Sequence, residues 1–118
     1  MELPTALRQA VDRYLEGTSL VDLRAAADRL SRRYRAETRD GSLHLDGETS
    51  MKAYLAARLP ATYAAIRASM GYLADAVPGF SPRTLIDVGA GPGSVLWAAA
   101  DCWDGLERAT LIEASEAA

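Results

Sequence analysis

The stretch Asp87-Val-Gly89-Ala-Gly91-Pro-Gly93 decides the fold of this chain. Three glycines at alternate positions indicate a tight turn whose backbone reaches positive φ angles that other residues disfavour. Glycine also lacks a Cβ, so a ligand can approach the main chain closely. A helix that begins after such a turn presents free N–H groups and the positive end of its dipole to an anionic group. The stretch therefore predicts a ligand-binding turn between a strand and a helix.

The residues around this turn predict one strand–helix–strand unit. Thr84–Val88 is a short apolar run, partly β-branched and bounded by proline and glycine, which is typical of a buried strand. Residues 94–103 have a helical pattern, and Ala109–Ile112 is a second apolar run. This order makes a βαβ unit, whose two strands pair in parallel.

The residues before the turn predict helices. Two amphipathic segments precede residue 40, and Ser19 with Asp22 three residues later fits the capping box of the second. Thr49 or Ser50 can cap a third helix, and Pro60 marks a kink or a new start. The expected apolar face of the fourth helix consists of Ile66, Met70, Leu73 and Val77.

We therefore predict an α/β fold that is mostly helical in this chain. A helical subdomain covers residues 1–80, and the first βαβ unit of a Rossmann-like sheet covers residues 83–118. A loop covers residues 40–50, in which Leu43-His44-Leu45 is a candidate extended piece. The composition, 49% hydrophobic and 25% charged, is typical of a soluble globular protein.

Two cofactors suit a glycine turn with an acid after the second strand. The dinucleotide fingerprint G-x-G-x-x-G needs its third glycine at position 94, which is Ser94. The observed pattern D-x-G-x-G-x-G resembles that of class I S-adenosylmethionine methyltransferases. Asp87 repels a pyrophosphate but suits the ammonium or ribose of S-adenosylmethionine. A turn that only packs the helix on the strand and binds nothing is the simpler alternative.

On this reading S-adenosylmethionine is the expected cofactor. The glycines let the backbone approach its methionine moiety, and Asp87 orients the loop or meets the ammonium group. Glu113, which stands 20 residues after Gly93, accepts the ribose hydroxyls. The expected cofactor-binding residues are Asp87, Gly89, Gly91, Gly93 and Glu113. The sequence identifies no catalytic residue, and a single histidine and a single cysteine argue against a metal site.

Three segments carry a closer resemblance: residues 54–66, residues 78–94 and residues 109–115. Together they resemble the methyltransferase-like proteins associated with the mitochondrial ribosomal small subunit, and their bacterial relatives. The resemblance runs from about Leu3 to Ser115. It implies a helical region ahead of a methyltransferase-like domain, and a role connected with ribosomal RNA or small-subunit assembly. A non-catalytic assembly or RNA-binding factor that keeps the fold as a scaffold is the alternative.

The resemblance also predicts that this chain is a fragment, inactive by itself. A class I methyltransferase sheet has about seven strands, whereas two are predicted here. The cysteine cluster that binds iron–sulfur in the family would lie in the absent C-terminal part. Two parallel strands are a poor free-standing sheet, so its open edge is a candidate for self-association.

Charge is unevenly distributed along the chain. Residues 1–39 hold eight arginines against six acids, whereas residues 84–118 hold one arginine against six acids. An anionic partner therefore prefers the N-terminal third. A solvated helix face is the simpler interpretation of its arginine cluster, and contact with RNA phosphates is the alternative. The clustered residues are Arg29, Arg32, Arg33, Arg35 and Arg39, and Asp28 can pair with Arg32.

The remaining expectations are weaker. Arg58 and Tyr63 flank the Pro60 break and are candidates for the edge of the cofactor pocket, although packing and capping explain them equally well. Tyr34 and Trp103 are expected in the core, and Cys102 is expected to be a buried structural thiol. No apolar run approaches the roughly 20 residues of a membrane span, and no secretory signal is visible. A cytoplasmic location is expected.

Overall fold

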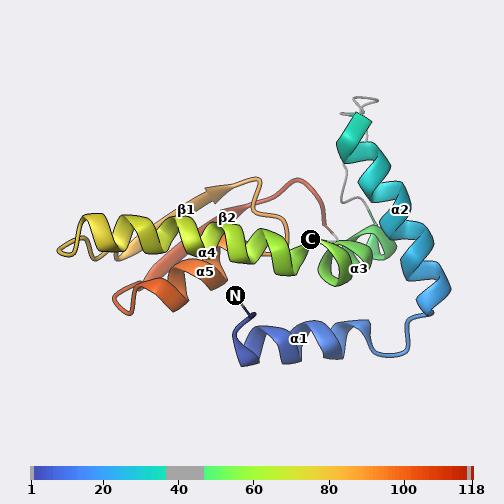
Figure 1. Cartoon of the computed structure of the whole chain (residues 1–118), viewed down its shortest axis with the longest axis horizontal. Helices are drawn as coiled ribbons and strands as arrows, with labels where there is room; N and C mark the ends of the chain where they lie inside the picture. Colours follow the sequence, from blue (N-terminus) through green and yellow to red (C-terminus); the bar gives the residue numbers. More distant parts are fainter. Residues whose placement is uncertain (1, 37–46, 117) are drawn as a thin grey trace.

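The computed structural model describes residues 2–36, 47–116 and 118, excluding the side chains of residues 34–36. Four helices come first, and a strand, a helix and a strand follow them (Figure 1). The elements are α1 (Thr5–Leu15), α2 (Leu20–Ala36), α3 (Glu48–Ala57), α4 (Leu59–Ala76), β1 (Thr84–Val88), α5 (Ser94–Cys102) and β2 (Arg108–Ile112). The candidate extended piece at 43–45 and Arg39 lie outside the described residues, as do the side chains of Tyr34 and Arg35.

The strand–helix–strand unit predicted from the sequence is confirmed. β1 and β2 pair in parallel, in a register that runs from Thr84 opposite Arg108 to Val88 opposite Ile112. α5 connects the two strands, and the described residues form this one two-stranded sheet. The chain is therefore an α/β protein that is mostly helical. A wider Rossmann-like sheet stays a prediction.

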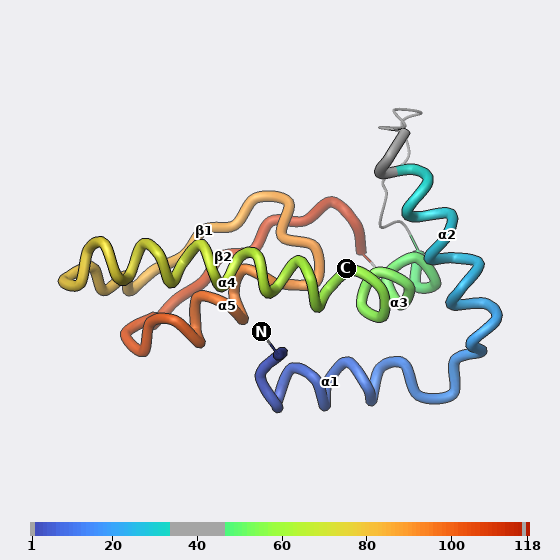
Figure 2. The backbone as a smooth tube through the Cα atoms, viewed as in Figure 1, coloured from blue at the N-terminus to red at the C-terminus, as the bar shows by residue number. Residues whose placement is uncertain are grey.

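α4 is the longest of the described helices, and α3 and α5 pack against it (Figure 2). Its buried residues Leu59 and Tyr63, 2% and 1% exposed, join Leu7 and Val11 of α1 and Ala98 of α5 in one apolar core. The helices before residue 80 thus share a core with the βαβ unit that follows. The division at 1–80 and 83–118 stays a prediction.

An ion pair also holds α4 against α5. The Arg67 Nε–H donates to Asp101 Oδ2 over 2.8 Å. Burial, together with the neighbouring Asp101 carboxylate, raises the pKa of the Tyr63 phenol. Because Tyr63 and Arg67 are one helical turn apart on α4, the apolar core and the ion pair fix the same face of the helix. The position of α5, and hence of the turn that begins it, follows from α4.

Pro60 lies at the start of a new helix, which confirms one of the two alternatives, a kink or a new start, predicted for it. α3 ends at Ala57 and α4 starts at Leu59, with the proline in its first turn, where a missing N–H is tolerated. The expected cap of α3 at Thr49 or Ser50 is wrong. The helix begins at Glu48 after Gly47, whose φ of 95° lies in the region that glycine favours.

The capping box of α2 is confirmed in its first half, since the Asp22 N–H donates to Ser19 Oγ over 3.4 Å. The expected face of α4 is too long, because Leu73 and Val77 are 43% and 47% exposed. Both residues lie after Arg67, which pairs with Asp101 near the end of α5.

Cys102 is half-buried and not fully buried as expected. Trp103 is also half-buried, with its ring against Phe80 in an edge-to-face contact at 5.5 Å. Phe80 is itself 43% exposed, so this contact lies at the rim of the molecule and not in its core.

One face of the sheet is open. Residues alternate along β1, so Ile86 and Val88 point away from the helices, and they are 72% and 75% exposed. Ile112, opposite Val88 on β2, is 52% exposed. The self-association expected from the open edge of the sheet stays a prediction.

The core around α4 predicts the effect of Leu59→Ala. Leu59 is 2% exposed, so its removal leaves a cavity that should lower the free energy of unfolding by about 2–5 kcal/mol. Urea unfolding followed by circular dichroism measures the change. Leu20→Ala removes the same atoms from a side chain that is 62% exposed, and its effect should stay within about 0.5 kcal/mol. Equal effects of the two substitutions would contradict the assigned core.

Candidate functional site

The glycine turn lies at the carboxyl end of β1 and is tied to the end of β2. The N–H groups of Gly89 and Ala90 both donate to the Ile112 carbonyl oxygen, over 2.7 and 3.1 Å. Gly89, Gly91 and Gly93 have φ angles of 76°, 57° and 92°. All three lie in the region that side chains disfavour, which explains why glycine occupies these positions.

The turn delivers the chain directly into α5. Gly93 is the N-cap residue in a left-handed conformation, and its carbonyl accepts the Trp97 N–H over 3.2 Å. Ser94, the first residue of the helix, is only 5% exposed. Its hydroxyl is enclosed and has no hydrogen-bond partner among the described residues. A buried hydroxyl without a partner is unusual, since such groups are nearly always hydrogen-bonded.

The Glu113 carboxylate joins the two loops that follow the strands. Its Oε1 accepts the Gly91 N–H over 2.8 Å, and its Oε2 accepts the Ser115 N–H over 2.7 Å. Both bonds are charge-assisted, so they are stronger than bonds between neutral groups. Glu113 thereby fixes the middle of the glycine turn to the segment that leaves β2.

These backbone bonds control the ionisation of Glu113. The N–H of Ser115 first, and then that of Gly91, lower the pKa of the Glu113 carboxyl, which outweighs the opposing effect of burial. The side chain is therefore a carboxylate at neutral pH. Each of its oxygens keeps a further lone pair for another donor.

Asp87 is the second acid of the site. It is the fourth residue of β1, opposite Leu111, and is half-buried. Its Oδ2 is enclosed and has no hydrogen-bond partner within the described ranges. In the sequence, the enclosed oxygen of Asp87 thus precedes the glycine turn and that of Ser94 follows it.

The turn has room for a ligand where a side chain would otherwise lie. A Cβ added to Gly89 would meet no atom within 4 Å. One added to Gly93 would meet only Leu111 Cδ1, at 3.8 Å. The glycines are therefore required by backbone angle and not by crowding, and the backbone at Gly89 is open to approach. Open backbone, enclosed acceptors without partners and a fixed carboxylate fit a polar ligand such as S-adenosylmethionine.

The five residues expected to bind a cofactor lie together at the carboxyl ends of the two strands. This is the edge where ligands bind in open α/β sheets. Tyr63 is in the core, and Arg58 lines a separate cleft between α2 and α4. Ser94 and the backbone-bridging role of Glu113 were not found from the sequence. A bond between residues 22 apart leaves no local pattern, whereas a serine at the start of a helix is too common to single out.

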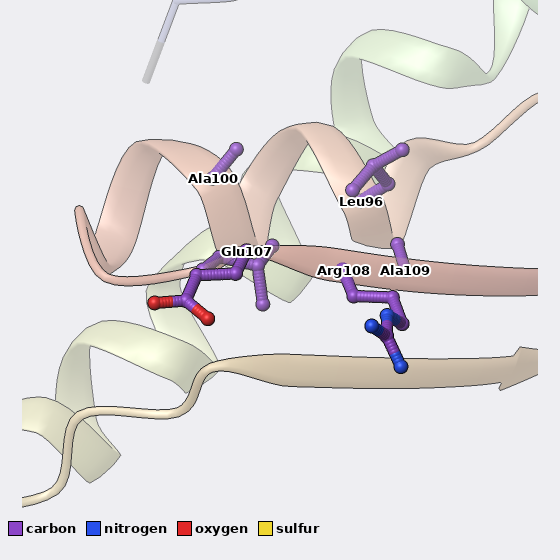
Figure 3. Close-up of a pocket in the computed structure, with 6 residues that line it drawn as sticks. Leu96, Ala100, Glu107, Arg108 and Ala109 are labelled. Atoms are coloured by element: carbon purple, nitrogen blue, oxygen red, sulfur yellow. The ribbon is translucent and has the colours of Figure 1, made fainter.

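Among the described residues, clefts also lie away from this turn. One is lined by α5 residues and by the start of β2, including Leu96, Glu107 and Arg108 (Figure 3). It lies at the amino end of β2, opposite the edge that carries Glu113. The other lies beside α2 and includes Ser31 and Arg58. Within the described residues, no group of three potential ligands could hold a metal ion.

The fold and the turn define an α/β protein with a glycine-rich turn after the first strand and an acid after the second strand. Comparison with known families is more specific. The family model described as mitochondrial small ribosomal subunit Rsm22 matches residues 48–118, which is more than half of the chain. The chain belongs to this family, and the resemblance inferred from the sequence is confirmed.

A curated relative agrees with this assignment. The chain is 44% identical over 50 residues to the human protein named ribosome assembly protein METTL17, mitochondrial. The match covers 42% of this chain and 11% of the relative. The names of the family and the relative both refer to mitochondria, so they do not support the expected cytoplasmic location. None of the described helices is long and apolar enough to cross a membrane.

Glu113→Gln should change how stability depends on pH. Because the folded-state pKa is below the ordinary value of 4.5, the carboxylate stabilises the fold above that pH and loses this effect as pH falls through the folded pKa. The variant should therefore be less stable than the wild type at neutral pH, and the difference should shrink in acid. Denaturant unfolding over a pH series measures it.

The matched control is Glu116→Gln, which removes an exposed carboxylate from the same segment. It should leave the acid side of the stability curve as in the wild type. A Glu113→Gln protein that is as stable as the wild type at neutral pH would show that the bonds to Gly91 and Ser115 contribute nothing.

Proposed function

We propose that this chain carries the S-adenosylmethionine-binding part of a methyltransferase-like protein that takes part in assembly of the small ribosomal subunit. The observation that carries the cofactor assignment is the Glu113 carboxylate. It is fixed by two backbone bonds at the edge of an open glycine turn, where it still has lone pairs to offer.

The residues of the turn would divide the work of binding. Gly89 offers open backbone to the methionine moiety, and Glu113 accepts the two ribose hydroxyls. The enclosed oxygens of Asp87 and Ser94 suit the ammonium group, which has three donors to place. The acids also suit the positive sulfonium, whereas a pyrophosphate would be repelled. When bound, S-adenosylmethionine supplies a methyl group activated for transfer.

Transfer would depend on positioning, since a sulfonium methyl group needs alignment with its acceptor more than proton transfer. Among the described residues, both acids at the turn, Asp87 and Glu113, bind the cofactor in this scheme. We expect RNA to be the acceptor. We expect the 118-residue chain to bind the cofactor without turnover, because its sequence identifies no catalytic residue.

The assembly role rests on the printed names of the family and the relative, one a small-subunit protein and the other a ribosome assembly protein. Neither name states a transferase activity. This favours the second candidate, in which the fold is a scaffold for an assembly factor that binds the cofactor or RNA without methylating it. The intact protein separates the two candidates: cofactor binding with all RNA left unmodified favours the scaffold.

Calorimetric titration tests cofactor binding directly. S-adenosylmethionine and its demethylated product are titrated into the wild type and into Glu113→Ala. We expect binding to the wild type and a loss of at least about tenfold in the variant, since a carboxylate hydrogen-bonded to two hydroxyls contributes about 1.5–3 kcal/mol for each bond.

Glu107→Ala is the control, because Glu107 is an exposed carboxylate at the amino end of β2. It should bind the cofactor as the wild type does. Titration of NADH into the same proteins tests the dinucleotide alternative. Wild-type protein that binds neither cofactor would contradict the proposal for this chain, and binding of NADH alone would replace it.

A further inference from the structure

The outward surface of α2 concentrates positive charge. The helix contains five arginines and two aspartates, in a chain whose net charge is −3. It packs on α3 through Ala26 and Leu30, which are 3% and 2% exposed. With 3.6 residues per turn, the arginines off this stripe face solvent. Arg24, Arg29 and Arg32 are all exposed.

These arginines are not neutralised within the fold. The expected pair between Asp28 and Arg32 does not form: across the described part of the chain, no ion pair involves Arg24, Arg29 or Arg32. Figure 1 shows α2 at the end of the molecule opposite the start of β1 and the end of α4. Four of the six acidic residues that follow residue 84 lie between the start of β1 and the end of β2.

A cleft of about 250 Å³ lies beside α2. It is lined by Ser31 of α2, Ala57 of α3, Arg58 between α3 and α4, and Ala61 and Thr62 of α4. The cleft thus combines a guanidinium and two hydroxyls, and Ser31 directly precedes Arg32 in the sequence.

We propose that this surface binds RNA, with Arg29 and Arg32 on backbone phosphates and one ribose–phosphate unit in the cleft. The guanidinium of Arg58 suits a phosphate oxygen, since arginine binds phosphate with two parallel bonds. The hydroxyls of Ser31 and Thr62 can donate to or accept from a ribose 2′-OH, the group that distinguishes RNA from DNA. The proposal rests on the proposed function, for which it names the partner.

The chemistry of the surface favours a nucleic acid backbone over an acidic protein. Phosphates repeat at regular intervals along a strand, and Arg29 and Arg32 lie one turn apart on the same helix. A carboxylate partner would leave the two hydroxyls of the cleft without a role. This chemistry recognises the backbone, so binding should depend strongly on salt and weakly on base sequence.

The test is the salt dependence of binding to a short fluorescent RNA hairpin, measured by anisotropy with the full chain. Arg29→Gln with Arg32→Gln should weaken binding by about tenfold near 0.1 M salt and lower the slope of log K against log salt by about 1 for each arginine. Ala61→Leu fills the cleft without changing charge, so it should weaken binding and leave the slope unchanged. Circular dichroism and thermal melting verify that each variant is folded.

The control is Arg83→Gln with Arg108→Gln, which removes the same charge from exposed arginines at the other end of the molecule. It should bind RNA almost as the wild type does. Equal losses in both double variants would reduce the effect to net charge and overturn the proposal. An Ala61→Leu protein with wild-type affinity for RNA would show that the cleft takes no part in RNA binding. Equal binding of the matching DNA hairpin, or full competition by polyglutamate, would overturn the assignment to RNA.

The same proteins are titrated with S-adenosylmethionine. The two arginines of α2 lie outside the glycine turn, so the Arg29→Gln, Arg32→Gln protein should keep its cofactor affinity. Wild-type chain that shows the expected RNA binding but no cofactor binding would leave this inference standing and overturn the cofactor part of the proposed function. Wild-type chain that binds the cofactor but not RNA would overturn this inference alone.

Discussion

The arrangement of the glycine turn depends on one carboxylate. Glu113 accepts the N–H groups of Gly91 and Ser115, so it fixes two loops that are separate in sequence but adjacent at the end of the sheet. Two other N–H groups of the turn donate to the Ile112 carbonyl, one residue earlier. Without these bonds, three residues at positive φ would have no reason to hold one geometry, because glycine has more conformational freedom than any other residue. The last residues of β2 therefore shape the turn that follows β1.

The turn also needs a fixed helix behind it, and α4 supplies the support. Tyr63 and Leu59 on α4 pack with Ala98 of α5, while Arg67 binds Asp101 near the end of α5. The ion pair is partly exposed and contributes little by itself, so burial of apolar area carries most of this stabilisation. The ion pair instead sets the position of α5 along the axis of α4. The helical region is in this sense part of the candidate site, although none of its residues is expected to touch the proposed cofactor.

The sequence predicted those features that have a local cause. β1, α5 and β2 follow from short apolar runs bounded by turn residues, and the family follows from segments around them. Predictions from the sequence were wrong where a contact between residues distant in the chain determines the structure. The exposure of Leu73 and Val77 depends on where other elements lie along α4, and the start of α3 depends on the backbone of Gly47. The position of the five candidate residues at one edge was predictable from the parallel strands, whereas the bridging role of Glu113 was not, since nothing local distinguishes it from an acid that only faces solvent.

The two segments of the chain that carry the proposed sites differ in charge, and this difference agrees with the two ligands proposed for them. S-adenosylmethionine is cationic at its sulfonium and ammonium groups, and the turn that would hold it lies in the segment that carries six acids and one arginine. RNA is anionic, and the proposed surface lies on the helix that carries five arginines and two aspartates. A single surface with both charges would attract each ligand less and would bring phosphates towards Asp87 and Glu113. An RNA acceptor would have to extend from α2 towards the glycine turn to receive a methyl group, whereas an assembly factor needs no such path.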